Sequence, residues 1–293
     1  MSELLTAMRE RLLICDGAMG TELQAHGLQA SGCPELWNLS HPDAVEAIHR
    51  AYCAAGADVI LTNSFGGSRF KLEKFNLERQ VSELNEAAAC VARRAAGADQ
   101  FVLGDVGPTG ELMAPLGVRE PGEFEAVFAE QVEGLVRGGV DGIIIETMTA
   151  VEEAQAAVRA ARSVTDLPVL VSMQFKRDAD GAGLHTMMGV DVPMFVRSFA
   201  ELGVDALGGN CSSPGELADV VKQLREETSL PILAEPNAGV PQLINWKTVF
   251  PLGPNDFAEA VVELVRNGVS LLGGCCGTTP EHIRVLASRF RRT

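Results

Sequence analysis

Short runs of apolar residues recur along this chain, separated by segments in which apolar residues are spaced three and four apart. Within each run the apolar residues are nearly continuous, which is typical of strands buried on both faces of a parallel sheet. These runs predict eight strands, at residues 12–15, 57–61, 101–104, 140–145, 167–171, 204–207, 230–234 and 269–272.

The segments between the runs predict helices. The clearest are Asp43–Ala54, Val81–Ala95, Phe124–Val136, Val151–Arg162 and Phe257–Val265. Pro121 and Ser213-Pro214 are helix-start signals, and a glycine at the C-terminal side of each helix predicts a left-handed cap. Strands that alternate with helices in this way predict an α/β protein, a (β/α)8 TIM barrel forming a single domain over residues 1–293. A doubly wound open sheet is the alternative architecture.

Charge and composition narrow the classes of partner. The chain has 24 Lys and Arg against 39 Asp and Glu, a net charge of −15, which argues against binding to nucleic acid or to an anionic membrane. No run approaches the roughly 20 apolar residues of a membrane span, and the N-terminus lacks a secretion signal. We therefore expect a cytoplasmic protein whose seven cysteines stay reduced, so that they raise the question of metal binding rather than of disulfides.

Polar or thiol side chains follow almost every predicted strand. In a TIM barrel the chemistry gathers at the carboxyl ends of the strands, so these residues predict a functional rim. We interpret the segment from Asp105 to Gly110 as a rigid structural loop, because a carboxylate at Asp105 would repel a phosphate. The residues that follow the strands are Asp16, Asn63, Asp105, Glu146, Ser172, Gln174, Asn210, Cys211, Glu235, Asn237, Cys275 and Cys276.

Three cysteines stand out in this set. Cys211 follows the sixth predicted strand, and Cys275 and Cys276 follow the eighth, within a glycine-rich segment that allows close backbone approach. Three thiolates at one rim describe a catalytic zinc site with an open position. The alternative is that they are small buried apolar residues. Of the remaining cysteines, Cys33 lies in a loop and has no assigned role, and three are predicted to be core residues: Cys15, Cys53 and Cys90.

The motifs that contain these residues resemble a known family. Residues 16–22 (DGAMGTE), 209–211 (GNC) and 273–282 (GGCCGTTPEH) resemble the opening motif and the zinc signatures of homocysteine S-methyltransferase domains. Residues 61–66, 107–112, 235–239 and 247–252 are similar to the homocysteine-binding module of cobalamin-dependent methionine synthase. The resemblance extends from about Leu12 to about Leu286 and implies a (β/α)8 barrel.

The resemblance also implies roles for individual residues. Zn²⁺ would be bound by Cys211, Cys275 and Cys276, and Asn237 would supply an oxygen ligand when substrate is absent. The amino group of homocysteine would be held by Asp16 and Glu146, and its carboxylate by the backbone at Gly17 and Ala18. Asn210 would belong to the same substrate site and fix the turn before the first ligand.

The implied reaction is methylation of homocysteine to methionine, with the substrate activated as a zinc thiolate. The methyl donor is expected to be a methyl-corrinoid carried by a partner protein or module, so that this chain itself binds no cobalamin. Alternatives are a transferase that uses S-methylmethionine, or less plausibly betaine, and a non-catalytic zinc- or thiol-binding barrel. A zinc hydrolase is disfavoured, because an all-cysteine site lacks the histidine ligands typical of water activation.

Overall fold

An eight-stranded parallel sheet occupies the centre of the computed structural model, which describes residues 2–181, 183–244 and 247–291. Its strand order is β1-β12-β9-β8-β5-β4-β3-β2. Each of the eight predicted apolar runs overlaps one of these strands, and β3, β4, β5, β8 and β9 extend past the predicted run at the carboxyl end. Their bounds are β1 Leu13–Ile14, β2 Val59–Leu61, β3 Phe101–Val106, β4 Gly142–Met148, β5 Val169–Met173, β8 Ala206–Asn210, β9 Ile232–Glu235 and β12 Leu271–Leu272.

The two ends of this strand order meet and close the sheet. A parallel bridge joins Cys15 to Val59, the Asp16 amide donates to the Val59 carbonyl at 3.0 Å, and the Asp58 amide donates to the Ile14 carbonyl at 2.6 Å. Closure leaves no free edge on the central sheet. The predicted (β/α)8 barrel is therefore confirmed, and the open doubly wound sheet is excluded.

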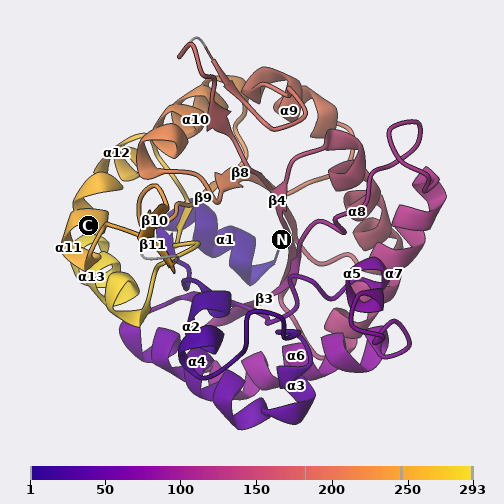
Figure 1. Ribbon diagram of the computed structural model, residues 1–293. Coiled ribbons are helices and arrows are strands. Elements are labelled where there is room, and N and C mark those ends of the chain that lie inside the picture. The colour runs from indigo at the N-terminus through magenta and orange to yellow at the C-terminus, as the bar shows by residue number, and fades with distance from the viewer. Residues whose placement is uncertain (1, 182, 245–246, 292–293) are drawn as a thin grey trace.

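Helices surround the strands as an outer ring, which Figure 1 shows in a view along the barrel. The ring comprises α4 Pro42–Ala55, α6 Val81–Ala95, α7 Pro121–Arg137, α8 Val151–Val164, α9 Val192–Phe199, α10 Pro214–Glu227, α11 Pro254–Ala260, α12 Val262–Arg266 and α13 Pro280–Phe290. The strand-to-helix segments contain further short elements: α2 Met19–Ala25, α3 Trp37–Ser40, α5 Arg69–Glu73, the pair β6 Lys176–Arg177 and β7 Leu184–His185, and the pair β10 Gln242–Ile244 and β11 Lys247–Val249.

Helix α1, Glu3–Glu10, fills the amino-terminal end of the barrel. Leu4, Leu5 and Met8 pack into the same apolar cluster as Leu13 and other barrel residues. A Cβ built at Gly142, the first residue of β4, would lie 3.4 Å from the Leu4 side chain. Figure 1 shows α1 inside the ring of helices. Because this end is occupied, the opposite, carboxyl end of the strands is left for a site.

One predicted helix is broken. The segment predicted as Phe257–Val265 forms two helices, α11 and α12, with Val261 between them at φ −94° and ψ 2°. The apolar pattern runs through the break because Phe257, Val261 and Leu264 are all fully buried. Hydrophobic periodicity alone cannot report a bend that keeps the same residues inside.

The expected glycine caps occur at only some helix ends. Gly56 caps α4 at φ 105°, and Gly139, Gly203 and Gly268 also have positive φ. Helices α8 and α10 end instead in extended threonines, Thr165 and Thr228. Each threonine hydroxyl accepts a hydrogen bond at 3.1 Å from the amide two residues later, in the sequences TDLP and TSLP. The prediction of a glycine at every helix end is therefore wrong, because a short side-chain turn performs the same reversal.

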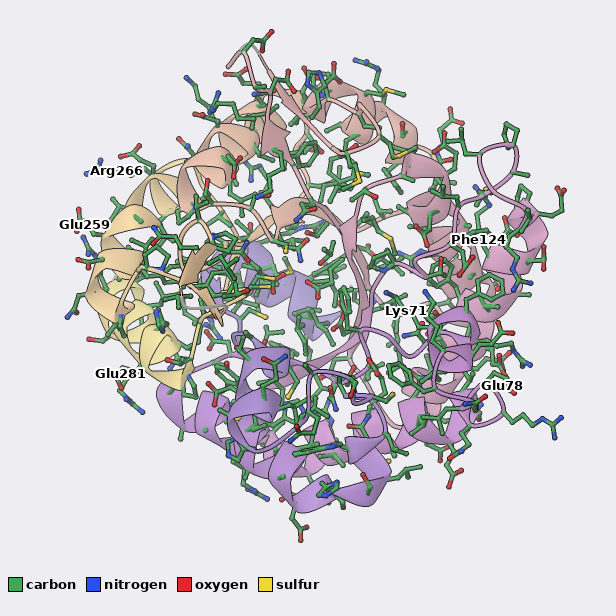
Figure 2. All side chains as sticks on the ribbon, viewed as in Figure 1. Lys71, Glu78, Phe124, Glu259, Arg266 and Glu281 are labelled. Atoms are coloured by element: carbon green, nitrogen blue, oxygen red, sulfur yellow. The ribbon has the colours of Figure 1, made fainter. Side chains whose placement is uncertain are left out.

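Charged side chains cover the outside of the ring. Figure 2 shows Glu259, Arg266 and Glu281 pointing outward from the outer helices. Many of these charges form exposed ion pairs within or between helices, such as Arg69 with Glu130 at 2.5 Å. Within the described ranges, no helix combines the length and the apolar character that crossing a membrane would need.

His49 on α4 gives a testable consequence for stability. It is fully buried, neither ring nitrogen has a hydrogen-bond partner among the described residues, and burial lowers its pKa from 6.5 to about 4. The unfolded chain binds the extra proton first, so His49 costs stability as the pH falls from about 6.5 towards 4. We expect the free energy of unfolding of His49→Leu, relative to that of the parent protein, to be about 2 kcal/mol higher at pH 5 than at pH 7.5, as measured by urea unfolding. A pH-independent difference would contradict this.

Candidate metal and substrate site

The sulfur atoms of Cys211, Cys275 and Cys276 form one cluster at the carboxyl ends of β8 and β12. All three lie within 4.8 Å of one another, and the Cys275 and Cys276 sulfurs are 3.9 Å apart. Sulfurs on a tetrahedral zinc with Zn–S bonds of about 2.3 Å would be separated by about 3.8 Å. The three residues that the sequence singled out are therefore brought together, at a spacing that could hold a metal ion.

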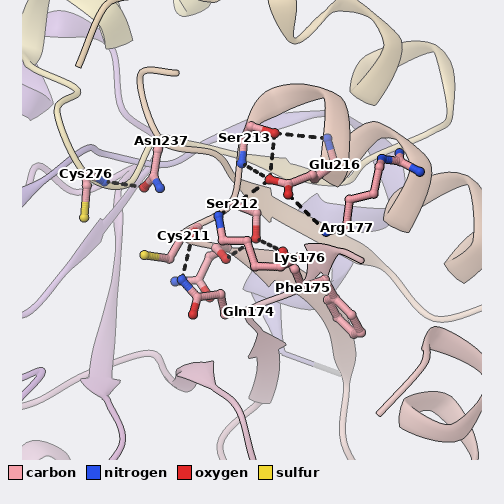
Figure 3. Close-up of polar contacts among 11 residues, drawn as sticks. Gln174, Phe175, Lys176, Arg177, Cys211, Ser212, Ser213, Glu216, Asn237 and Cys276 are labelled. Carbon is pink, nitrogen blue, oxygen red and sulfur yellow. Dashed lines mark hydrogen bonds and ion pairs between the residues drawn. The ribbon is translucent and has the colours of Figure 1, made fainter. Parts of the chain in front are cut away.

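Backbone contacts fix the position of each cysteine. Cys211 adopts a left-handed backbone conformation at φ 54°. Its amide donates a hydrogen bond to the Glu235 carbonyl at 3.1 Å. Its carbonyl accepts one from Gln174 Nε2 at 2.8 Å (Figure 3). The Cys275 amide donates to the Pro236 carbonyl at 2.8 Å. Strand β9 thus connects the two segments that carry the sulfurs.

Asn237, just after β9, reinforces this connection. Its Oδ1 accepts a hydrogen bond from the Cys276 amide at 3.0 Å, as Figure 3 shows. Its side chain also forms a hydrogen bond with Cys211 that lowers the pKa of that thiol. In this geometry Asn237 lies beside the sulfur cluster, where the resemblance expects a transient oxygen ligand, and it already serves to orient the cysteines.

The three thiols share hydrogen bonds, which changes their acidity. Bonds with Cys275 and Cys276 lower the pKa of Cys211 to about 3, and the bond with Cys211 raises the pKa of Cys276 to about 11. The bond with Cys211 likewise raises the pKa of Cys275. One thiolate is thus stabilised by two neighbouring thiols. A bound cation would replace those two protons and allow all three sulfurs to ionise.

A cavity of about 350 Å³ opens beside the sulfurs at the carboxyl end of the barrel. Asn210 and Asn237 are not among its lining residues and lie behind the wall as supports. The cavity wall includes most of the residues that the sequence predicted for the site: Asp16, Gly17, Ala18, Glu146, Cys211, Cys275 and Cys276.

Five buried carboxyl groups line this cavity: Asp16, Glu35, Asp105, Glu146 and Glu235. Burial raises the pKa of Asp16, Asp105, Glu146 and Glu235, that of Glu235 to about 7. Among the described residues that line the cavity, none is Lys, Arg or His. A cavity walled by carboxyl groups without a basic partner favours a cationic group on its ligand.

Asp16 and the two residues after it lie where β1 meets β2. Asp16 Oδ2 accepts from the Leu61 amide at 3.0 Å, so this carboxylate also ties the barrel closure together. The Ala18 amide donates to Thr278 Oγ1 at 3.1 Å, and a Cβ added to Gly17 would lie 2.7 Å from the same oxygen. Gly17 is therefore required for close approach, and the Ala18 amide is paired with the Thr278 hydroxyl.

Glu146 is aimed into the cavity by an irregularity in β4. The pairing register with β5 shifts between Ile145 and Met148, and Thr147 has a left-handed φ of 59°, a strained value for a β-branched residue. Asn210 holds both residues in place. Its Nδ2 donates to Glu146 Oε2 at 2.6 Å and to Thr147 Oγ1 at 2.7 Å, and its Oδ1 accepts from the Thr147 amide at 2.9 Å.

Comparison with known proteins agrees with this geometry. The sequence profile of the homocysteine S-methyltransferase family matches residues 13–290, almost the whole chain. The chain belongs to the homocysteine S-methyltransferase family. The resemblance that the motifs indicated is thereby confirmed.

Two similar curated proteins are methionine synthases. The chain is 32% identical over 310 residues to that of Mycobacterium leprae and 33% identical over 306 residues to that of Mycobacterium tuberculosis. The alignments cover 99% and 98% of this chain but 25% of each relative, so the chain spans about a quarter of their length. Among solved structures, the metallated form of the homocysteine methyltransferase MmuM from Escherichia coli is similar at a TM-score of 0.79 and 26% identity, covering 96% of this chain and 97% of that one.

Several contributions to this homocysteine S-methyltransferase site were not assigned from the sequence. The sequence placed Asp105 and Glu235 at strand ends but gave them no role in the site. In the structure Asp105 lines the cavity. The loop that follows it is anchored as predicted, because Thr109 donates hydrogen bonds to Glu153. Thr147 carried no signal at all. Its position depends on the register shift in β4, which no local pattern reports.

The other cysteines are not among the residues that line the cavity. Cys15 is buried, as predicted, and Cys53 is half-buried. Cys33 is buried and its thiol donates to Glu35 Oε2 at 3.2 Å. The prediction that Cys90 is a core residue is wrong, because it is exposed on α6. Its apolar neighbours in sequence face inward while Cys90 itself does not.

Asn210 offers a direct test of how the site is held. Replacing it with Ala would leave the Thr147 amide and hydroxyl, the Ser172 hydroxyl and a Glu146 oxygen without their buried partner. We expect Asn210→Ala to lower the free energy of unfolding by about 3 kcal/mol, measured by urea denaturation. The matched control Asn267→Ala removes one partly exposed hydrogen bond and should cost less than about 1 kcal/mol. Equal losses in the two variants would contradict the conclusion that the Asn210 hydrogen bonds hold the site together.

Proposed function

We propose that this chain is a zinc-dependent S-methyltransferase that transfers a methyl group to homocysteine and forms methionine. One observation carries the proposal: a cluster of three cysteine sulfurs at the mouth of a buried cavity walled by carboxyl groups. The sulfurs suit a soft, tetrahedral metal such as zinc, and the carboxyl groups suit the ammonium group of an amino acid.

Each part of the substrate then has its own partner. Cys211, Cys275 and Cys276 would hold the zinc ion, which supplies a means of deprotonating the substrate thiol near neutral pH. Asp16 and Glu146 would bind the ammonium group, and the backbone at Gly17 and Ala18 would receive the carboxylate.

Asn210 would act through Glu146, by fixing the direction in which its carboxyl group points.

In the proposed reaction the homocysteine sulfur forms a bond to the methyl carbon while the bond from the donor to that carbon breaks. The donor keeps the electron pair.

The surface around the cavity supports a methyl donor carried by a protein, as in a methyl-corrinoid protein or module. The exposed large apolar side chains of the described residues all lie in strand-to-helix segments or in the first turn after one. A protein partner would cover such a rim, whereas a small donor would not need it. These side chains are Leu39, Phe75, Leu112, Leu116, Val118, Met187, Met188, Met194, Val240, Leu243 and Val249.

The metal is tested by a pair of cysteine substitutions. Cys276→Ser removes one sulfur of the cluster, and we expect bound zinc to fall at least tenfold while the circular dichroism and melting temperature stay close to the parent. Cys90→Ser changes an exposed thiol outside the cluster and should retain one zinc per chain, measured by elemental analysis. Full zinc binding by Cys276→Ser would disprove the assignment.

The role of the metal in catalysis is tested by X-ray absorption. In a transferase, the zinc shell gains a sulfur when homocysteine is added. A shell that stays unchanged would favour the alternative, a zinc- or thiol-binding barrel without activity.

The donor is tested by supplying homocysteine with each candidate in turn. We expect methionine to form with methylcobalamin, which stands in for a corrinoid protein, and to be detected by mass spectrometry. Formation of methionine only with S-methylmethionine or betaine would overturn the corrinoid donor and leave the acceptor half of the proposal intact.

A further inference from the structure

The cavity is lined by more buried carboxyl groups than the proposed binding of the substrate ammonium uses. Asp16 and Glu146 account for two of the five buried carboxyl groups, which leaves Glu35, Asp105 and Glu235. Both oxygens of Glu35 accept hydrogen bonds, from the Gly66 amide at 2.7 Å and from the Cys33 thiol at 3.2 Å. Asp105 Oδ1 and Glu235 Oε2, in contrast, are buried without a hydrogen-bond partner among the described residues. Unpartnered buried carboxyl oxygens are costly, so each calls for an explanation.

The position of Asp105 in the barrel distinguishes it from Glu235. Around the barrel the strands follow the order β1, β2, β3, β4, so Asp105 on β3 stands between Asp16, just after β1, and Glu146 on β4. Glu235 ends β9, which lies between the two strands that carry the cysteines. Asp105 therefore belongs to the arc from β1 to β4, which carries none of the three clustered sulfurs, together with the two carboxyl groups assigned to the substrate ammonium.

The surroundings of Asp105 hold its backbone firmly while its carboxyl group stays available. The Asp105 amide donates to Thr62 Oγ1 at 2.9 Å, and its carbonyl accepts from Ser64 Oγ at 2.7 Å and from Gln131 Nε2 at 3.3 Å. The side chain lines the cavity and is 6% exposed. Burial, with the negative charges of Glu235 and Asp16, raises the pKa of Asp105, and a hydrogen bond with Glu146 opposes part of that rise.

An ammonium group has three N–H donors and needs three acceptors where water is excluded. We propose that Asp105 is a third carboxyl group that binds the ammonium of the thiol substrate, beside Asp16 and Glu146, and so determines selectivity for amino-acid thiols. This inference rests on the proposed function. Asp105 is a binding residue for the substrate and takes no part in making or breaking the S–C bond.

The test compares homocysteine with 4-mercaptobutanoate, which is homocysteine without its amino group. Asp105→Asn keeps the shape of the side chain but removes its charge. We expect the KM for homocysteine to rise about 30-fold with kcat within twofold of the parent, whereas kcat/KM for 4-mercaptobutanoate stays the same. Calorimetric titration of homocysteine, without any methyl donor, should show the same loss of affinity.

The control substitution is Glu153→Gln. Glu153 is also buried and anchors the loop after Asp105 through Thr109, but it does not line the cavity. We therefore expect Glu153→Gln to leave KM and kcat unchanged for both homocysteine and 4-mercaptobutanoate. Asp105→Ser provides a second neutral variant should the amide disturb the Thr62 and Ser64 contacts.

The outcomes separate the two proposals. A parent protein that neither binds nor methylates homocysteine would overturn the proposed function and this inference together. A parent protein that is active, with an Asp105→Asn variant whose preference for homocysteine is undiminished, would overturn this inference alone. Equal loss of kcat with both thiols would assign Asp105 a merely structural role and would also overturn it.

Discussion

The amide side chain of Asn210 is the interaction on which the geometry of the cavity depends. It is fully buried and joins three strands: its own β8, β5 through the Ser172 hydroxyl at 2.7 Å, and β4 through Glu146 and Thr147. The next residue is Cys211, so the side chain that orients the Glu146 carboxyl group is covalently adjacent to a residue of the sulfur cluster. Asn210 and its neighbour Cys211 thus link the sulfur cluster to the Glu146 carboxyl group on the cavity wall.

Two residues linked to this amide have backbone conformations that non-glycine residues rarely adopt. Thr147 has φ 59° and Cys211 has φ 54°. Such conformations cost roughly 1–3 kcal/mol each and persist only where the surroundings determine them. Here the surroundings are the Asn210 hydrogen bonds and the contact of the Cys211 amide with the Glu235 carbonyl at 3.1 Å. Two apolar clusters provide the stability against which this strain is held: one joins α1 to the barrel interior, and the other lies between the strands and the outer helices.

The sequence predicted the barrel well because burial on both faces of the strands leaves a direct trace in composition, as in residues 142–145 and 169–171. It also predicted that Cys211, Cys275 and Cys276 would meet, since parallel strands deliver their carboxyl ends to one rim. It did not predict the bend at Val261 or the inward direction of Asp105. Both depend on how elements pack together, and a local pattern of apolar and polar residues is unchanged by either.

The helix that fills the amino-terminal end of the barrel has a consequence for kinetics. With α1 packed beneath the strands, the cavity has its opening at the carboxyl end, where the sulfurs also lie. Two reactants that meet in such a cavity share one entrance, so the reactant that lies deeper has to arrive first and its product has to leave last. If the cavity holds two reactants together, as the proposed reaction requires, the architecture itself would impose an order on their binding.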